Sequence, residues 1–271
     1  MSNCDIDLIL QLTNIFETTN QSISIRDIAG IIQFTTGTGS AQEVIEEYTA
    51  INHPNEFTTM NSTLDAIKKN YLQTKDLNGD VNGLEGFCSA WDLASKQPSF
   101  QQCQIQVLAR RYWFPAFDFS QTIGMKLSVS IGQIYDSSVQ LGLEGTKDLV
   151  KRTGRLPESI AANAELKWFL ETRKQKLEEM GGAYGPTITR VKSYQYVMVN
   201  NPPSWNQSIS VLNNDGKVVT LTCNSKFQLP NMTKQLDPIK PFDPNEISRD
   251  VALIPHMYLL FNMYLILILI G

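Results

Sequence analysis

Apolar residues recur at the spacing of one helix face along most of the chain, and this pattern restricts the possible folds most. The first such stretch runs from Ile6 to Phe16 and predicts a helix that ends near Glu17. The same spacing predicts further helices over residues 60–72, 86–96, 100–112, 120–141, 146–152 and 161–179. Helix dominates, so the chain is predicted to be mainly α.

A few stretches depart from this spacing. Residues 22–28 (SISIRDI) alternate as a short strand does. Residues 193–199 (SYQYVMV) and 217–223 (KVVTLTC), with the turn signal NNDG at 213–216, predict extended segments or a hairpin. Ser40, followed three residues later by Glu43, predicts an N-cap with a capping box at the start of a helix.

Composition and charge narrow the class of protein and its partners. The 271 residues are 42% hydrophobic and 18% charged, which excludes disorder, collagen and coiled coil as the main architecture. The formal net charge is −4, so we expect no nucleic-acid partner, and a cationic substrate suits the chain better.

Cysteine and histidine are too few to carry most metal or imidazole chemistry. The four cysteines form no C-x-x-C pair, and their redox state stays open from the sequence. Only two histidines are present, so we expect no metal site, no cofactor and no histidine-based triad. Carboxylates are the candidate acids and bases. Four N-x-S/T sequons permit glycosylation in a secretory pathway or arise by chance in an Asn- and Thr-rich chain; they begin at Asn20, Asn61, Asn206 and Asn231.

The two ends of the chain are unusual. The N-terminus lacks the basic region and cleavage site of a signal peptide, which predicts an intracellular protein or a missing true start. We predict a domain over residues 1–235, a Pro-rich linker over 236–250 and an apolar tail over 251–271. That tail is about long enough to span a membrane, and three interpretations compete: a membrane anchor, a core helix and a non-native end from a misread gene.

Several blocks in register resemble glycoside hydrolase family 46, the chitosanases. They are LTNIFETT at 12–19, GIIQFTTGTGSAQEVIEEYT at 30–49, AWDLASKQPSFQQCQ at 90–104, RRYWFPA at 110–116, IGQIYDSSVQLG at 131–142 and the region 169–205. The resemblance implies a lysozyme-like two-lobed α+β fold with a substrate cleft between the lobes. It also implies a secreted enzyme, expected to be a monomer, that cuts β-1,4 linkages between glucosamine residues of chitosan with inversion.

Particular residues fall on the family's functional positions. By this resemblance Glu17 is the general acid; a solvated helix-end carboxylate is the alternative. Asp136, Arg173 and Arg190 fall on a buried charge network that supports the acid. Asp136 also lies on an apolar helix face, where a carboxylate needs a cationic partner.

The remaining matches concern the substrate. Tyr112 falls on a cleft tyrosine, with a half-buried core aromatic as the alternative, whereas Trp91 is expected to be core. The backbone of the small residues in TTGTG is expected to line the cleft; these residues include Thr36, Gly37, Thr38 and Gly39. A phosphate-binding loop is the alternative, but the segment lacks the Walker lysine.

The resemblance breaks directly after Glu17. In the family a longer segment ending in G-D-G-R-G-Y-T carries the catalytic Asp and a substrate-binding Arg, but here twelve residues separate Glu17 from Gly30. Arg26 remains a candidate for substrate binding and Asp27 a candidate surrogate base, although their order and spacing differ from that motif; Ser40 replaces an acidic substrate-binding residue.

Three explanations of the break stay open: a dropped gene segment, loss of the base, or recruitment of Asp27 as a weaker base. Two other functions compete with a chitosanase. One is a catalytically inactive sugar-binding protein of the same fold, and the other is a lysozyme-like hydrolase of peptidoglycan.

Overall fold

The computed structural model describes most of the helical part of the chain. Its described residues are 1–17, 32, 34, 36, 39–74, 83–154, 162–202, 205–224 and 226–230. The chain divides into two compact units, one made of Met1–Phe16 with Tyr112–Gly271 and the other of Glu17–Arg111. The predicted strand at 22–28, the linker and the apolar tail lie outside the described residues. Among the residues that are described, no helix is long and apolar enough to cross a membrane.

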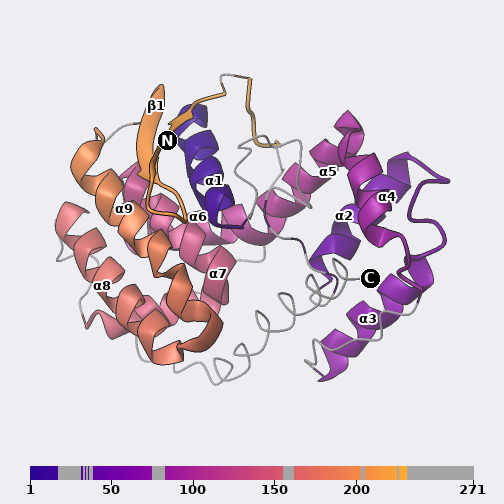
Figure 1. The fold of residues 1–271 in the computed structure, drawn as a ribbon, viewed down its shortest axis with the longest axis horizontal. Helices are drawn as coiled ribbons and strands as arrows, with labels where there is room; N and C mark the ends of the chain where they lie inside the picture. The colour runs from indigo at the N-terminus through magenta and orange to yellow at the C-terminus, as the bar shows by residue number, and fades with distance from the viewer. Residues whose placement is uncertain are drawn as a thin grey trace. The chain divides into compact units, whose positions relative to one another are not determined.

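The unit that contains both ends of the described chain is built around α7. Residues 128–138 of this helix are all buried, so α7 has no solvent-facing side over three turns. In Figure 1, α7, α8 and α9 lie together, with β1 beside α9. The elements of this unit are α1 (Asn3–Glu17, which ends one residue beyond it), α6 (Phe114–Thr122), α7 (Ser128–Arg152), α8 (Ala162–Met180), η3 (Gly182–Thr187), α9 (Ile188–Asn200), β1 (Ser208–Leu212) and β2 (Val218–Thr222).

The two strands form an antiparallel hairpin. Ile209 pairs with Leu221 and Val211 with Val219, so that buried residues of β1 face α9. The loop between them is the NNDG turn expected from the sequence, in which Asn213 Oδ1 accepts hydrogen bonds from the backbone N–H of Asp215 and of Lys217. The described chain therefore confirms a mainly α fold with a small β element.

The other unit is a helical cluster around aromatic side chains. Trp91 is 2% exposed, as expected for a core residue, and its ring centroid lies 4.9 Å from that of Phe100. Phe100 also contacts Phe57 at 5.7 Å and Tyr48 at 5.0 Å. Its elements are α2 (Ser40–Ile51), α3 (Asn61–Thr74), α4 (Phe87–Ser95), α5 (Pro98–Leu108) and the first residues of the π-helix η1 (Ala109–Trp113).

The predicted helix over residues 120–141 is interrupted, because the chain turns between α6 and α7; residues 128–141 are helical as predicted. Gly124 adopts φ 74°, a left-handed conformation that favours glycine. The N–H of Met125 bonds the carbonyl of Ser120, and the N–H of Gly124 bonds that of Gln121. These two bonds are a Schellman motif, which ends a helix. Because apolar residues continue through this turn at a similar spacing, the sequence pattern does not reveal the end of the helix.

Three other local predictions also need correction. Residues 193–199 are helical rather than extended, and their buried positions Tyr194 and Val197 keep the helical spacing. Residues 146–152 belong to α7, which is kinked at Gly142 with φ 74°. The N-cap of α2 is Gly39 rather than Ser40, and the cap makes no side-chain hydrogen bond. Gly39 takes this place because its left-handed φ of 75° closes the preceding turn.

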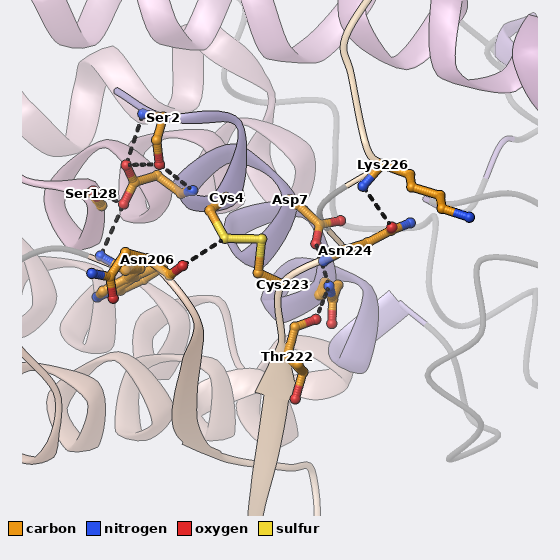
Figure 2. Close-up of a disulfide and its surroundings, with 12 residues drawn as sticks. Ser2, Cys4, Asp7, Ser128, Asn206, Thr222, Cys223, Asn224 and Lys226 are labelled. Carbon is orange, nitrogen blue, oxygen red and sulfur yellow. Dashed lines mark hydrogen bonds between the residues drawn. A yellow bond between two sulfur atoms is a disulfide. The ribbon is translucent and has the colours of Figure 1, made fainter.

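A disulfide joins the start of α1 to the residue that follows β2. Cys4 and Cys223 are paired across 219 residues of sequence (Figure 2). Hydrogen bonds reinforce the same place: Asp5 Oδ1 accepts from Ser128 Oγ at 2.7 Å, and Asp7 Oδ2 accepts from the N–H of Asn224 at 2.6 Å. The disulfide and the two hydrogen bonds thus connect the first turns of α1 to α7 and to the end of the hairpin.

Removing this disulfide should lower stability markedly. We expect the Cys4→Ser/Cys223→Ser variant to lose about 2–5 kcal/mol in free energy of unfolding, since the bond closes a long loop. Urea unfolding of the oxidised protein measures the change, and Cys88→Ser, which removes an exposed free thiol, is the matched control. Equal midpoints for the double variant and the control would contradict a stabilising disulfide.

Candidate active site

Glu17 ends α1 and its side chain is buried. The residue is only 5% exposed, although the helix stops there. Leu8, Ile9 and Leu12 are completely buried and hold one face of the helix in the core. The structure thus places the carboxyl group of Glu17 away from bulk water at the end of α1.

Asp136, Arg173 and Arg190 come together in the interior, each from a different helix. Asp136 on α7 is 0% exposed, and its Oδ2 lies 2.8 Å from Nη1 of Arg173 on α8. Its Oδ1 lies 2.8 Å from Nη2 of Arg190 on α9, whose Nε donates to Oδ2 at 3.2 Å. Two guanidinium groups therefore share one carboxylate inside the unit.

The electrostatics of this network keep Asp136 ionised. Burial by itself would raise the pKa of Asp136, but the charges and hydrogen bonds of Arg190 and Arg173 lower it below its ordinary value. Burial lowers the pKa of Arg173, while Asp136 opposes that change. Because two cations meet one anion, further polar groups are needed to satisfy the guanidinium donors.

Two residues not identified from the sequence extend the network. Gln140, one helical turn after Asp136 on α7, accepts hydrogen bonds through Oε1 from Nε and Nη2 of Arg173. The guanidinium carbon of Arg190 lies 5.5 Å from the ring centroid of Phe16, the residue before Glu17. The i, i+4 spacing of Asp136 and Gln140 was a usable signal, but nothing local indicated Phe16.

Tyr112 lies in η1 and is half-buried. The next residue, Trp113, is 2% exposed and packs against Tyr135 of α7 with ring centroids 5.3 Å apart. The core aromatic of this segment is thus Trp113, and Tyr112 retains partial exposure.

The turn before α2 is described in part. The backbone N–H of Gly39 donates to the carbonyl of Thr36 at 3.0 Å, and Thr36 is half-buried. A Cβ at position 39 would lie 3.0 Å from Cγ of Lys68, so glycine also avoids crowding there. Gly37, Thr38, Arg26 and Asp27 lie outside the described residues.

Ion pairs join α2 to η1 within the unit made of Glu17–Arg111. Arg110 Nη1 lies 2.5 Å from Oε1 of Glu47, and Arg111 Nη1 lies 2.6 Å from Oε1 of Glu43. The i, i+4 spacing of Glu43 and Glu47 places both carboxylates on one face of α2. Their arginine partners lie more than 60 residues further along the chain, so the sequence pattern could not predict these ion pairs. The part of the chain that is described contains no cluster of three or more His, Cys, Asp or Glu suited to a metal ion.

Comparisons with known proteins all point to one group. The model for Glycosyl hydrolase family 46 matches residues 27–203. A chitosanase of Bacillus subtilis (strain 168) is 27% identical over 234 residues, which are 76% of this chain and 80% of that protein.

Solved structures agree with this match. The native chitosanase from Bacillus subtilis MY002 has a TM-score of 0.71 at 26% identity, covering 82% of this chain and all of that one. A glutamate-to-alanine mutant of the MY002 chitosanase, complexed with 6 GlcN, has a TM-score of 0.68 at 25% identity over 81% of this chain and 99% of that one. The Gynuella sunshinyii chitosanase complexed with chitotetraose shares the fold, with a TM-score of 0.71 at 24% identity over 83% of this chain and all of that one. The lysozyme-like fold class expected from the sequence is thereby confirmed.

Proposed function

The chain belongs to glycosyl hydrolase family 46, and from this premise we propose that it binds chitosan and cuts its β-1,4 linkages internally, with inversion. The observation that carries the proposal is the burial of Glu17 at the end of α1, at 5% exposure, in a chain that matches the family over most of its length. The MY002 relative complexed with 6 GlcN supports glucosamine oligosaccharides as the ligands.

Glu17 is the proposed general acid. It protonates the glycosidic oxygen as the bond to the anomeric carbon breaks, while a water attacks the opposite face of the sugar. The attacking water needs a carboxylate to take its proton. Asp27 is the only acidic residue between Glu17 and Gly30, so it is the proposed surrogate base.

The buried network is proposed to position the acid. Asp136 holds Arg173 and Arg190, which ties α7, α8 and α9 together. Arg190 in turn contacts the ring of Phe16, directly before Glu17. A shift of the network would therefore move the end of α1 and the carboxyl group it carries.

Substrate contacts are proposed at Arg26, Tyr112 and the backbone of residues 36–39. The formal net charge of −4 supports a polycationic substrate, because protonated glucosamine amines are attracted to an acidic protein. We propose that the protein is secreted and acts as a monomer. The Cys4–Cys223 disulfide supports secretion, since disulfides persist mainly in oxidising compartments.

A sugar-binding protein without turnover is the second candidate. The observation that favours it is the short connection of twelve residues between Glu17 and Gly30, which lacks the D-G-R-G-Y-T motif of the family. Without a placed base, the acid and the binding surfaces still accept the polymer, but the water is not activated.

We expect chitosan hydrolysis by this chain to be at least ~10²-fold slower than by an intact relative, with oligosaccharide binding better retained. Reducing-end release and glucosamine-oligomer affinity should be measured on one preparation, beside the chitosanase of Bacillus subtilis (strain 168) as the reference. Full turnover would contradict the loss of the base. Absence of both binding and turnover, together with lysis of bacterial walls, would favour a peptidoglycan hydrolase instead.

A further inference from the structure

We propose that Asn206 is an N-glycosylation site, carrying an oligosaccharide on its side-chain amide nitrogen. Asn206, Gln207 and Ser208 form a sequon whose middle residue is not proline. This inference rests on the secretion proposed above and is independent of chitosan hydrolysis.

The fold presents this sequon outward at a fixed place. Asn206, Gln207 and Ser208 are all exposed, whereas Trp205 before them and Ile209 after them are each 1% exposed. The two buried side chains anchor the backbone on either side. A bulky hydrophilic glycan on Asn206 would therefore extend into solvent without displacing the core.

Backbone hydrogen bonds hold the segment from both sides. The N–H of Trp205 donates to Asp5 Oδ1 at 3.1 Å, and the N–H of Cys223 donates to the carbonyl of Gln207 at 2.7 Å. Figure 2 shows Asn206 beside the disulfide, where its main-chain oxygen lies 3.2 Å from Cys4 Sγ. This contact uses the backbone of Asn206, not its side-chain amide.

The adjacent disulfide is the independent observation. Cys4 and Cys223 pair across almost the whole described chain, and such bonds form in oxidising compartments such as the lumen of the endoplasmic reticulum. N-x-S/T sequons of secreted proteins are acceptors on their surface loops. A molecule that acquires this disulfide there is thus exposed to oligosaccharide transfer at Asn206.

The second sequon in the described residues offers a contrast. Asn61 is half-buried at the first position of α3, and Leu64, one turn later, is 1% exposed. A glycan at Asn61 would be attached to a half-buried residue of α3, which packs against α2. Asn206, in contrast, lies in an exposed bend before β1. We therefore expect higher occupancy at Asn206 than at Asn61.

The full chain, behind a cleavable secretion leader, should be produced in a yeast and treated with peptide-N-glycosidase F in heavy-oxygen water. Peptide mass spectrometry should then find Asn206 converted to labelled aspartate in most molecules. Asn206→Gln and Ser208→Ala should each lose one glycan by gel mobility, and Ser208→Thr, which keeps the sequon, should retain it.

Each outcome decides the proposal. Secreted protein with the Cys4–Cys223 disulfide intact but Asn206 unmodified overturns glycosylation alone. Free thiols at both Cys4 and Cys223 in the secreted protein would overturn the disulfide, and with it the support that the disulfide gives to secretion and to the glycan. Chitosan hydrolysis by the same samples is scored separately, so its absence leaves the glycan result standing.

Discussion

Glu17→Gln should reduce chitosan hydrolysis by about 10²–10⁴-fold while leaving the fold near-native. The amide keeps the size and shape of the buried side chain but cannot supply a proton to the leaving oxygen. Reducing-end release from soluble chitosan measures the loss, and thermal melting checks the fold. Oligomer affinity should change far less than the rate, because the acid acts on the bond rather than on the remote sugar units.

The matched control for this substitution is Glu178→Gln. Glu178 is an exposed carboxylate on α8 that pairs with Lys174 at 3.3 Å, so its loss should leave the rate unchanged. A Glu17→Gln protein that keeps more than about a tenth of the parental rate would show that another group protonates the leaving oxygen, given the usual worth of such an acid.

Asp136→Ala should destabilise the protein by about 3–5 kcal/mol, because two buried guanidinium groups would lose their shared carboxylate. Arg173 is 0% exposed and Arg190 is 1% exposed, so water cannot replace the lost partner without opening the core. Urea unfolding measures the effect. Should the alanine variant not fold, Asp136→Asn, which keeps the shape and removes the charge, gives the same direction of change.

Asp148→Ala on the same helix is the control. Asp148 pairs with Arg152 at 2.8 Å on a partly exposed surface, and such a pair contributes only about 0.2–1 kcal/mol. A shift for Asp136→Ala no larger than that of Asp148→Ala would refute an energetically important network.

The same network predicts a dependence of stability on pH. Since the pKa of Asp136 is lowered from its usual 3.8, the stabilisation is complete above that value and is lost as the pH falls through the lower pKa of the folded state. The parental protein should lose this contribution on acidification, and Asp136→Ala should not show that part of the slope.

Local pattern predicted much of the helical framework. The helix ending at Glu17, the helix over 161–179 and the turn at Asn213 were all expected from spacing and turn residues. The apolar spacing gave a wrong prediction at Gly124, where a left-handed backbone conformation ends a helix. The residue types gave a wrong prediction at 193–199, where aromatic and β-branched residues form part of a helix. In both places side-chain type was a poor guide to main-chain geometry.

The family, the mainly α architecture and the candidate residues could be predicted from the amino-acid sequence, because residue type and short-range spacing carry them. The pairs of groups that meet could not: Cys4 with Cys223, Arg190 with Phe16, and the two arginines with Asp136. Helix packing brings these partners together across long stretches of chain, and no local pattern records such packing. For the charged residues among them, burial requires a partner, because an unpaired charge in the core costs too much free energy.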